Sequence, residues 1–123
     1  MITGIVTPER EAFIVLMVQG PDGQAEEIPA VIDTGFDGSL RLPSKTIARL
    51  GLTWRSRGRA LLADGSESIF DIHEAIVIWD GQPRRIAIDT VDMIPLVGMS
   101  LLDGHELTIQ VCDDGKVMIQ RLP

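Results

Sequence analysis

The sequence has few of the residues that mark secreted, membrane-spanning or aromatic-rich proteins. Its single cysteine, Cys112, cannot form an intrachain disulfide, and aromatic residues make up only 4% of the chain, with no tyrosine. No segment reaches the roughly 18 consecutive apolar residues that a membrane-spanning helix needs. The first residues, MITGIVTPERE, lack the basic start and apolar stretch of a signal peptide. We therefore expect a cytoplasmic protein with an aliphatic core and no membrane partner.

Positive charge is also scarce. Eleven Lys and Arg residues stand against eighteen Asp and Glu residues, which gives a net charge of -7. Binding to nucleic acid or to an anionic membrane surface depends on clustered Lys and Arg, so neither is an expected partner. We interpret two small basic groups, Arg55 to Arg59 and Arg84 with Arg85, as solvent-exposed faces or ends of strands.

Turn signals, by contrast, are frequent. Asp-Gly occurs six times, and between extended runs it favours a hairpin because both residues tolerate positive φ. Four of these pairs separate runs that are typical of strands: 11–19 from 24–32, 59–63 from 68–79, 68–79 from 83–91, and 106–112 from 116–122. We expect one all-β domain that spans residues 1–123.

Helix signals are limited to two short segments. In PSKTIARLGL, Ser44 can cap a helix, Ile47 and Leu50 share one face, and Gly51 ends it. SLLDG, which begins at Ser100, predicts a single short turn of helix.

The residues that carry chemistry lie at the end of an apolar strand, in VIDTGFDG. A carboxylate such as Asp33 beside buried strand residues is costly unless it is hydrogen-bonded or shares a proton. Gly35 allows close backbone approach and chain reversal, and a second acid follows at Asp37. Alone, Asp33-Thr34-Gly35 is equally typical of a tight turn. The apolar residues that precede it and the strand Leu40-Arg41-Leu42 that follows it favour a catalytic loop.

A second segment, Pro95-Leu96-Val97-Gly98, lies about 60 residues further on and leads into the short turn at Ser100. The order of an Asp-Thr-Gly loop, a hairpin, two apolar residues with Gly, a short helix and a final strand resembles the retropepsin-like aspartic proteases. The phrase Asp33-Thr34-Gly35-Phe36 is most similar to a prokaryotic branch of that clan. The resemblance implies a closed acid-protease-type β-barrel with one or two short helices.

The resemblance also implies a mechanism and a set of roles. Two copies of the chain would form a homodimer in which one Asp33 from each shares a proton and activates water against a peptide bond, without metal or cofactor. Thr34 and Gly35 would support this dyad. Gly35, Asp37 and Val97 would contact the polypeptide substrate, together with Ala63, Asp64 and Gly65 at the tip of a mobile hairpin, the flap.

Other candidates are weaker, and two alternatives stay open. Gly98-Met99-Ser100 lacks the second Gly of a serine nucleophile elbow, and His73 and His105 have no metal-ligand spacing. Asp89 is interpreted as an ordinary strand acid. Because Phe36 is bulkier than the small residue of many relatives, and the flap tip is polar, an inactive peptide-binding or dimerisation module of the same fold is the main alternative. A purely structural β protein is the second.

Overall fold

The computed structural model describes all residues, 1–123. Ten strands and two short helices follow one another along the chain: β1 (Ile2–Val6), β2 (Ala12–Gln19), β3 (Ala25–Ile32), β4 (Leu40–Leu42), α1 (Ser44–Leu50), β5 (Thr53–Leu61), β6 (Glu67–Trp79), β7 (Gln82–Thr90), β8 (Leu96–Val97), α2 (Met99–Leu102), β9 (His105–Ile109) and β10 (Lys116–Arg121). The expected all-β class with two short helices is therefore confirmed. Neither helix is long or apolar enough to cross a membrane.

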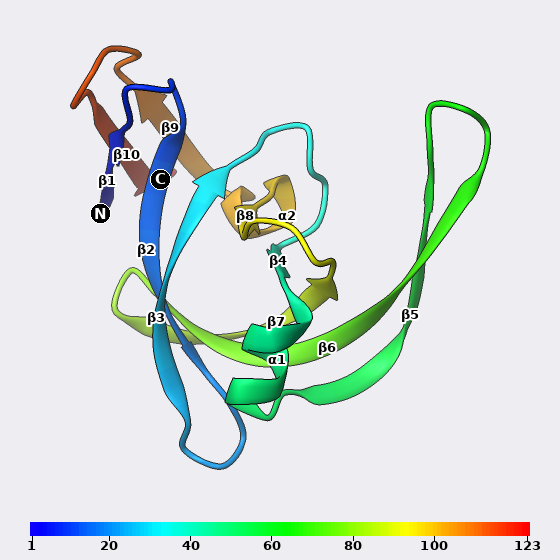
Figure 1. Cartoon of the computed structure of the whole chain (residues 1–123). Helices are drawn as coiled ribbons and strands as arrows, with labels where there is room; N and C mark the ends of the chain where they lie inside the picture. The colour runs from blue at the N-terminus through cyan, green and yellow to red at the C-terminus, as the bar shows by residue number, and fades with distance from the viewer.

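The sheet closes on itself. Its strand order is β5-β6-β7-β4-β8-β3-β2-β1-β10-β9, and a further pairing of β6 with β2 joins six of these strands into a ring. The hairpin β5–β6 extends away from this ring on one side, and β1, β10 and β9 continue the sheet on the other (Figure 1). The expected closed barrel is this ring, with two extensions that leave β5 and β9 as the free edges.

The predicted hairpins form at the positions of the Asp-Gly pairs. At the β6–β7 turn both central residues have positive φ, 52° at Asp80 and 79° at Gly81, which matches the right-handed twist of the flanking strands. The β2–β3, β5–β6 and β9–β10 hairpins form as well. Strand β1 was not predicted, and β5 begins at Thr53 rather than at Arg59. Strand β1 does not adjoin an Asp-Gly pair, the signal by which the other hairpin strands were predicted, and β5 was predicted only over the part next to its Asp-Gly turn.

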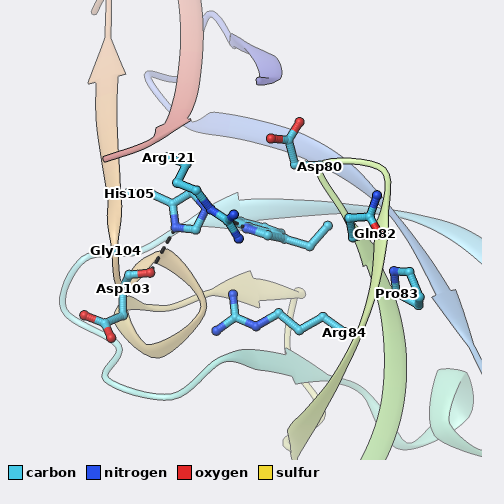
Figure 2. A pocket seen from close by; sticks show the side chains of 9 residues that line it. Asp80, Gln82, Pro83, Arg84, Asp103, Gly104, His105 and Arg121 are labelled. Atoms are coloured by element: carbon cyan, nitrogen blue, oxygen red, sulfur yellow. Dashed lines mark hydrogen bonds between the residues drawn. The ribbon is translucent and has the colours of Figure 1, made fainter. Parts of the chain in front are cut away.

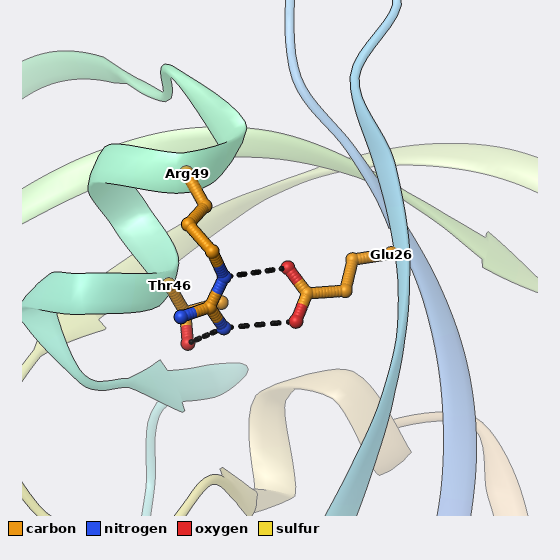
Figure 3. Close-up of polar contacts among 3 residues, drawn as sticks. All are labelled: Glu26, Thr46 and Arg49. Carbon is orange, nitrogen blue, oxygen red and sulfur yellow. Dashed lines mark hydrogen bonds and ion pairs between the residues drawn. The ribbon is translucent and has the colours of Figure 1, made fainter.

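Helix α1 lies where it was predicted, but Ser44 does not cap it. The N-cap position is Pro43, and the Ser44 hydroxyl instead donates to Asp92 Oδ1 at 2.6 Å. Gly51 ends the helix as expected, with a left-handed φ of 61°. The Arg49 side chain fixes the helix to β3 through two parallel bonds to Glu26, of 2.8 and 3.2 Å (Figure 3).

The core fills the ring and is aliphatic, as the composition indicates. It contains 21 buried residues, and Trp79 is the one aromatic residue among them. Ala30, Leu40, Leu42 and Val97 have no exposed surface, so the strands that lead into and out of the Asp33 loop are anchored in the core. The loop is thus held at both ends by buried side chains.

Candidate active site

Asp33 stands directly after β3, at the point where β3 meets β8. The two strands pair in parallel, with Val31 opposite Leu96 and Ile32 opposite Val97. The Asp33 amide donates to the Val97 carbonyl oxygen at 2.9 Å, and its carboxylate Oδ1 accepts the Gly35 amide at 2.8 Å. The side chain is half-buried. The structure therefore brings together three of the expected site residues, Asp33, Gly35 and Val97.

The rest of the loop is bonded to the start of α2. The Met99 amide donates to the Phe36 carbonyl at 2.8 Å, the Ser100 amide to the Gly38 carbonyl at 3.1 Å, and the Gly98 amide to the Ser39 carbonyl at 3.0 Å. The Ser100 hydroxyl donates to the Asp37 carbonyl at 2.5 Å. These bonds to the start of α2 fix the loop conformation. Sequence reasoning did not assign Ser100 this supporting role.

Phe36 packs over two glycines. A Cβ at Gly38 would lie 2.4 Å from Phe36 Cζ, and one at Gly98 would lie 2.5 Å from Phe36 Cδ2. Neither glycine needs positive φ, so glycine is required here for close packing alone. The Phe36 ring is half-buried against the Gly38 and Gly98 backbones, which explains how a bulky residue fits at this position of the loop.

Thr34 and Gly35 form the exposed top of the loop. The Thr34 hydroxyl has no hydrogen-bond partner within the chain, which leaves it free for a second molecule. Gly35 does not have the left-handed φ of a chain-reversing glycine. Its conformation is instead fixed by the bond to Asp33, and a Cβ there would lie 3.2 Å from Asp33 Oδ1.

Asp37 and Asp89 lie close enough to influence each other. Asp37 is exposed, whereas Asp89, near the end of β7, is half-buried with Oδ2 directed at Gly38. Burial, and secondly the charge of Asp37, raise the pKa of Asp89 above its ordinary value. Asp89 is a strand acid as interpreted, but it also faces the candidate site.

The predicted flap is the hairpin of β5 and β6, with Asp64 and Gly65 at its tip. Asp64 Oδ1 accepts the Ser66 amide at 2.9 Å and the Ser66 hydroxyl at 2.5 Å, and these bonds lower the pKa of Asp64. Gly65 has a φ of 86°. The polar residues of the tip thus stabilise its own turn.

The flap does not contact the Asp33 loop. No hydrogen bond or ion pair joins Ala63, Asp64 or Gly65 to that loop, and the hairpin projects away from the ring (Figure 1). Below the tip, Leu61 and Ile69 are 78% and 61% exposed. Sequence reasoning missed these two apolar side chains, which flank the polar turn on both arms and could be covered by a bound peptide.

The histidines do not form a metal site. The Nδ1 atom of His73 lies 2.9 Å from the Thr90 hydroxyl, and His105 bonds to Trp79 and to the Asp103 carbonyl. No group of three or more His, Cys, Asp and Glu side chains is placed to hold a metal ion.

Comparison with known proteins identifies the fold. No family model matches the chain, and no curated protein matches it. Among solved structures, a retropepsin-like aspartic protease from Rickettsia conorii is similar with a TM-score of 0.62 and 18% identity, over 99% of this chain and 91% of that one. EIAV protease in complex with an inhibitor gives a TM-score of 0.56 and 14% identity, over 77% of this chain and 88% of that one. The fold is retropepsin-like.

Proposed function

We propose that this retropepsin-like chain is an aspartic endopeptidase that acts as a homodimer, with Asp33 as its catalytic residue. The observation that carries the proposal is the position of Asp33: half-buried, at the end of β3, oriented by the Gly35 amide and tied to Val97. The similarity to two aspartic proteases at the level of the fold supports the same general activity.

The chemistry requires two carboxyl groups and one proton between them. Within the chain, the Asp33 carboxylate accepts a hydrogen bond from the Gly35 amide, and the proposed second acid is Asp33 of another copy. The ionised member of the pair takes a proton from a water molecule, whose oxygen attacks the peptide carbonyl carbon. The protonated member donates to the carbonyl oxygen. Collapse of the tetrahedral intermediate breaks the C–N bond as the nitrogen is protonated.

The free edge of β9 is the proposed place where two copies meet. The Gln110 amide donates to Lys116 O and the Leu122 amide to Gly104 O. Because antiparallel bonding alternates, the even-numbered residues of β9 bond to β10, and the amides and carbonyls of Leu107 and Ile109 face outward. The other free edge, β5, carries three arginines, which oppose pairing with a like edge.

Charge restricts the register of such a pair. With Leu107 on the two-fold axis, Glu106 lies opposite Thr108 of the partner subunit; with Thr108 on the axis, the two Thr108 side chains face each other. A pair centred on Glu106 would oppose two like charges and is disfavoured. Thr108 is exposed, so substitutions there leave the packed side of β9 unchanged.

Two substitutions at Thr108 test this interface by sedimentation equilibrium. Thr108→Glu should weaken dimerisation in both allowed registers. Thr108→Lys should strengthen it when Leu107 is central, because the introduced ammonium group then faces Glu106 of the partner subunit. The same variant should weaken dimerisation when position 108 is central, because two ammonium groups then face each other. If neither variant changes the dimerisation constant, β9 is not the interface.

The activity is tested by incubating purified protein with an unfolded protein substrate between about pH 3 and 7, where shared-proton carboxyl pairs work. Cleavage should disappear in Asp33→Asn and persist in Asp22→Asn, a control that removes an exposed carboxylate from the β2–β3 turn. Absence of cleavage by a folded dimer, or cleavage that survives Asp33→Asn, would refute the proposal. The first of these outcomes would favour the inactive peptide-binding module.

A further inference from the structure

A cavity of about 500 Å³ lies apart from the Asp33 loop. It is bounded by the β6–β7 turn, the start of β7, the connection from α2 to β9, and the end of β10. None of its lining residues belongs to the loop, to β8 or to the flap. Figure 2 shows the side chains of Arg84 and Arg121 directed into this space from opposite sides.

Neither arginine has a carboxylate partner. Five other arginines of the chain form ion pairs, but Arg84 and Arg121 form none. The half-buried Arg84 donates to the Leu101 carbonyl at 3.2 Å, which occupies one of its five N–H donors. Two guanidinium groups therefore line one cavity without an ion pair, in a chain with a net charge of -7.

One wall of the cavity is rigid. The Trp79 indole N–H donates to His105 Nε2 at 3.1 Å, so this nitrogen is an acceptor, and Nδ1–H of His105 donates to the Asp103 carbonyl at 2.9 Å. These bonds fix the neutral Nδ1–H tautomer. Both nitrogens are occupied, so the arginines supply the positive charge that faces the cavity.

The acidic side chains limit how much negative charge the cavity can accept. Asp80 lines the cavity together with the two arginines. Asp103 is exposed and has no ion-pair partner. These two aspartates offset part of the positive charge of the two arginines, so the cavity suits a single carboxylate better than a dianionic phosphate.

We propose that this cavity binds a small carboxylate ligand, held by the Arg84 and Arg121 guanidinium groups against the wall of Trp79 and His105. Guanidinium groups bind carboxylates through paired N–H donors in a plane. The proposal does not depend on the proposed proteolytic activity, because none of these residues belongs to the candidate active site.

The chain offers its own reporters for a test by NMR. It has two tryptophans: the Trp79 indole lines the cavity, whereas the Trp54 indole lies on β5 and donates to Asp71. At pH 7, N-acetylglycine should shift the Trp79 indole resonance saturably and leave that of Trp54 unchanged. N-acetylglycinamide, which lacks the carboxylate, should shift neither. Inorganic phosphate should bind more weakly than N-acetylglycine.

Two arginine variants complete the test. Arg121→Gln, at an exposed position whose side chain makes no hydrogen bond or ion pair within the chain, should weaken N-acetylglycine binding about tenfold, as expected for loss of a charge-assisted hydrogen bond. Arg10→Gln, which removes an exposed and unpaired arginine elsewhere, should leave binding unchanged. An absent or non-saturable shift, an equal response to the amide, tighter binding of phosphate, or unchanged binding by Arg121→Gln would each overturn the proposal.

Discussion

The close packing of Gly38, Gly98 and Phe36 predicts that two similar glycine substitutions will behave differently. A Cβ at Gly98 would lie 2.2 Å from the Gly38 carbonyl oxygen and 2.7 Å from that of Phe36, whereas ordinary contact begins at 3.4 Å. Gly98 has a φ of -112°, which alanine adopts without strain. Any loss of stability in Gly98→Ala is therefore steric. It arises mainly from clashes with backbone atoms, which cannot rotate away as a side chain can.

The size of that cost follows from what must move. The loop has to retreat by about 1 Å, which strains the bonds of 2.8, 3.0 and 3.1 Å that tie it to α2. Overpacking costs about 1–3 kcal/mol, and each weakened hydrogen bond adds about 0.5–1.5 kcal/mol. We expect Gly98→Ala to lower the free energy of unfolding by about 3–5 kcal/mol, and to reduce activity because Asp33 is held by the same segment.

Gly38→Ala is the matched comparison. Its Cβ would meet the Phe36 ring, at 2.4 Å from Cζ and 2.6 Å from Cε1, and the next nearest atom is Asp89 Oδ2 at 3.2 Å. The cost, about 1–3 kcal/mol, should largely disappear in the Phe36→Ala background. The cost of Gly98→Ala should largely remain there, because the backbone contacts persist. The two double-mutant cycles thus predict a large coupling energy for Gly38 with Phe36 and a small one for Gly98 with Phe36.

Urea unfolding at one fixed protein concentration measures both cycles, since the proposed dimerisation would make apparent stability depend on concentration. A Gly98→Ala protein within about 0.5 kcal/mol of the parent would refute the packing argument. So would a Phe36→Ala background that rescues Gly98→Ala as fully as Gly38→Ala.

Three further predictions concern single positions. Burial, and secondly the charge of Asp37, raise the pKa of Asp89 in the folded protein. The contribution of the Asp89 side chain to stability is therefore fully present below the unfolded carboxyl pKa of about 3.9, and it is lost as the pH rises through the pKa of Asp89 in the folded state. Asp89→Asn should therefore have a higher Tm than the parent at pH 7 and an equal one near pH 3; equal curves throughout would exclude this linkage. Asp64→Ala removes both acceptor bonds to Ser66 and should speed amide hydrogen exchange at the flap tip without changing Tm; unchanged exchange would show that the turn does not need the carboxylate. Leu101→Ala empties a fully buried position in α2 and should cost about 2–5 kcal/mol in urea unfolding, whereas a cost below about 1 kcal/mol would mean that α2 is not part of the cooperative core.

The sequence by itself determined most of the elements and their order. Asp-Gly pairs and apolar alternation are local signals, so the hairpins, the helix that ends at Gly51 and the two segments around Asp33 and Val97 could be predicted. Strand β1 could not, because ITGIV is short and includes a glycine, and its place between β2 and β10 depends on residues more than 100 positions away. Ser44 was mistaken for a cap because its bond to Asp92 spans 48 positions.

Only the tertiary structure decided how the candidate site is built. Asp33 and Val97 are 64 positions apart, and a parallel pairing of β3 with β8 brings them within one hydrogen bond. The packing of Phe36 against Gly98, the influence of Asp37 on Asp89 and the convergence of Arg84 and Arg121 likewise join residues that are far apart in the sequence. Sequence patterns report the conformation of neighbouring residues, whereas contacts of this kind depend on how strands are ordered in the closed sheet. The sequence indicated Asp33 as the acid, and the fold oriented its carboxylate through the Gly35 amide and tied its backbone to Val97.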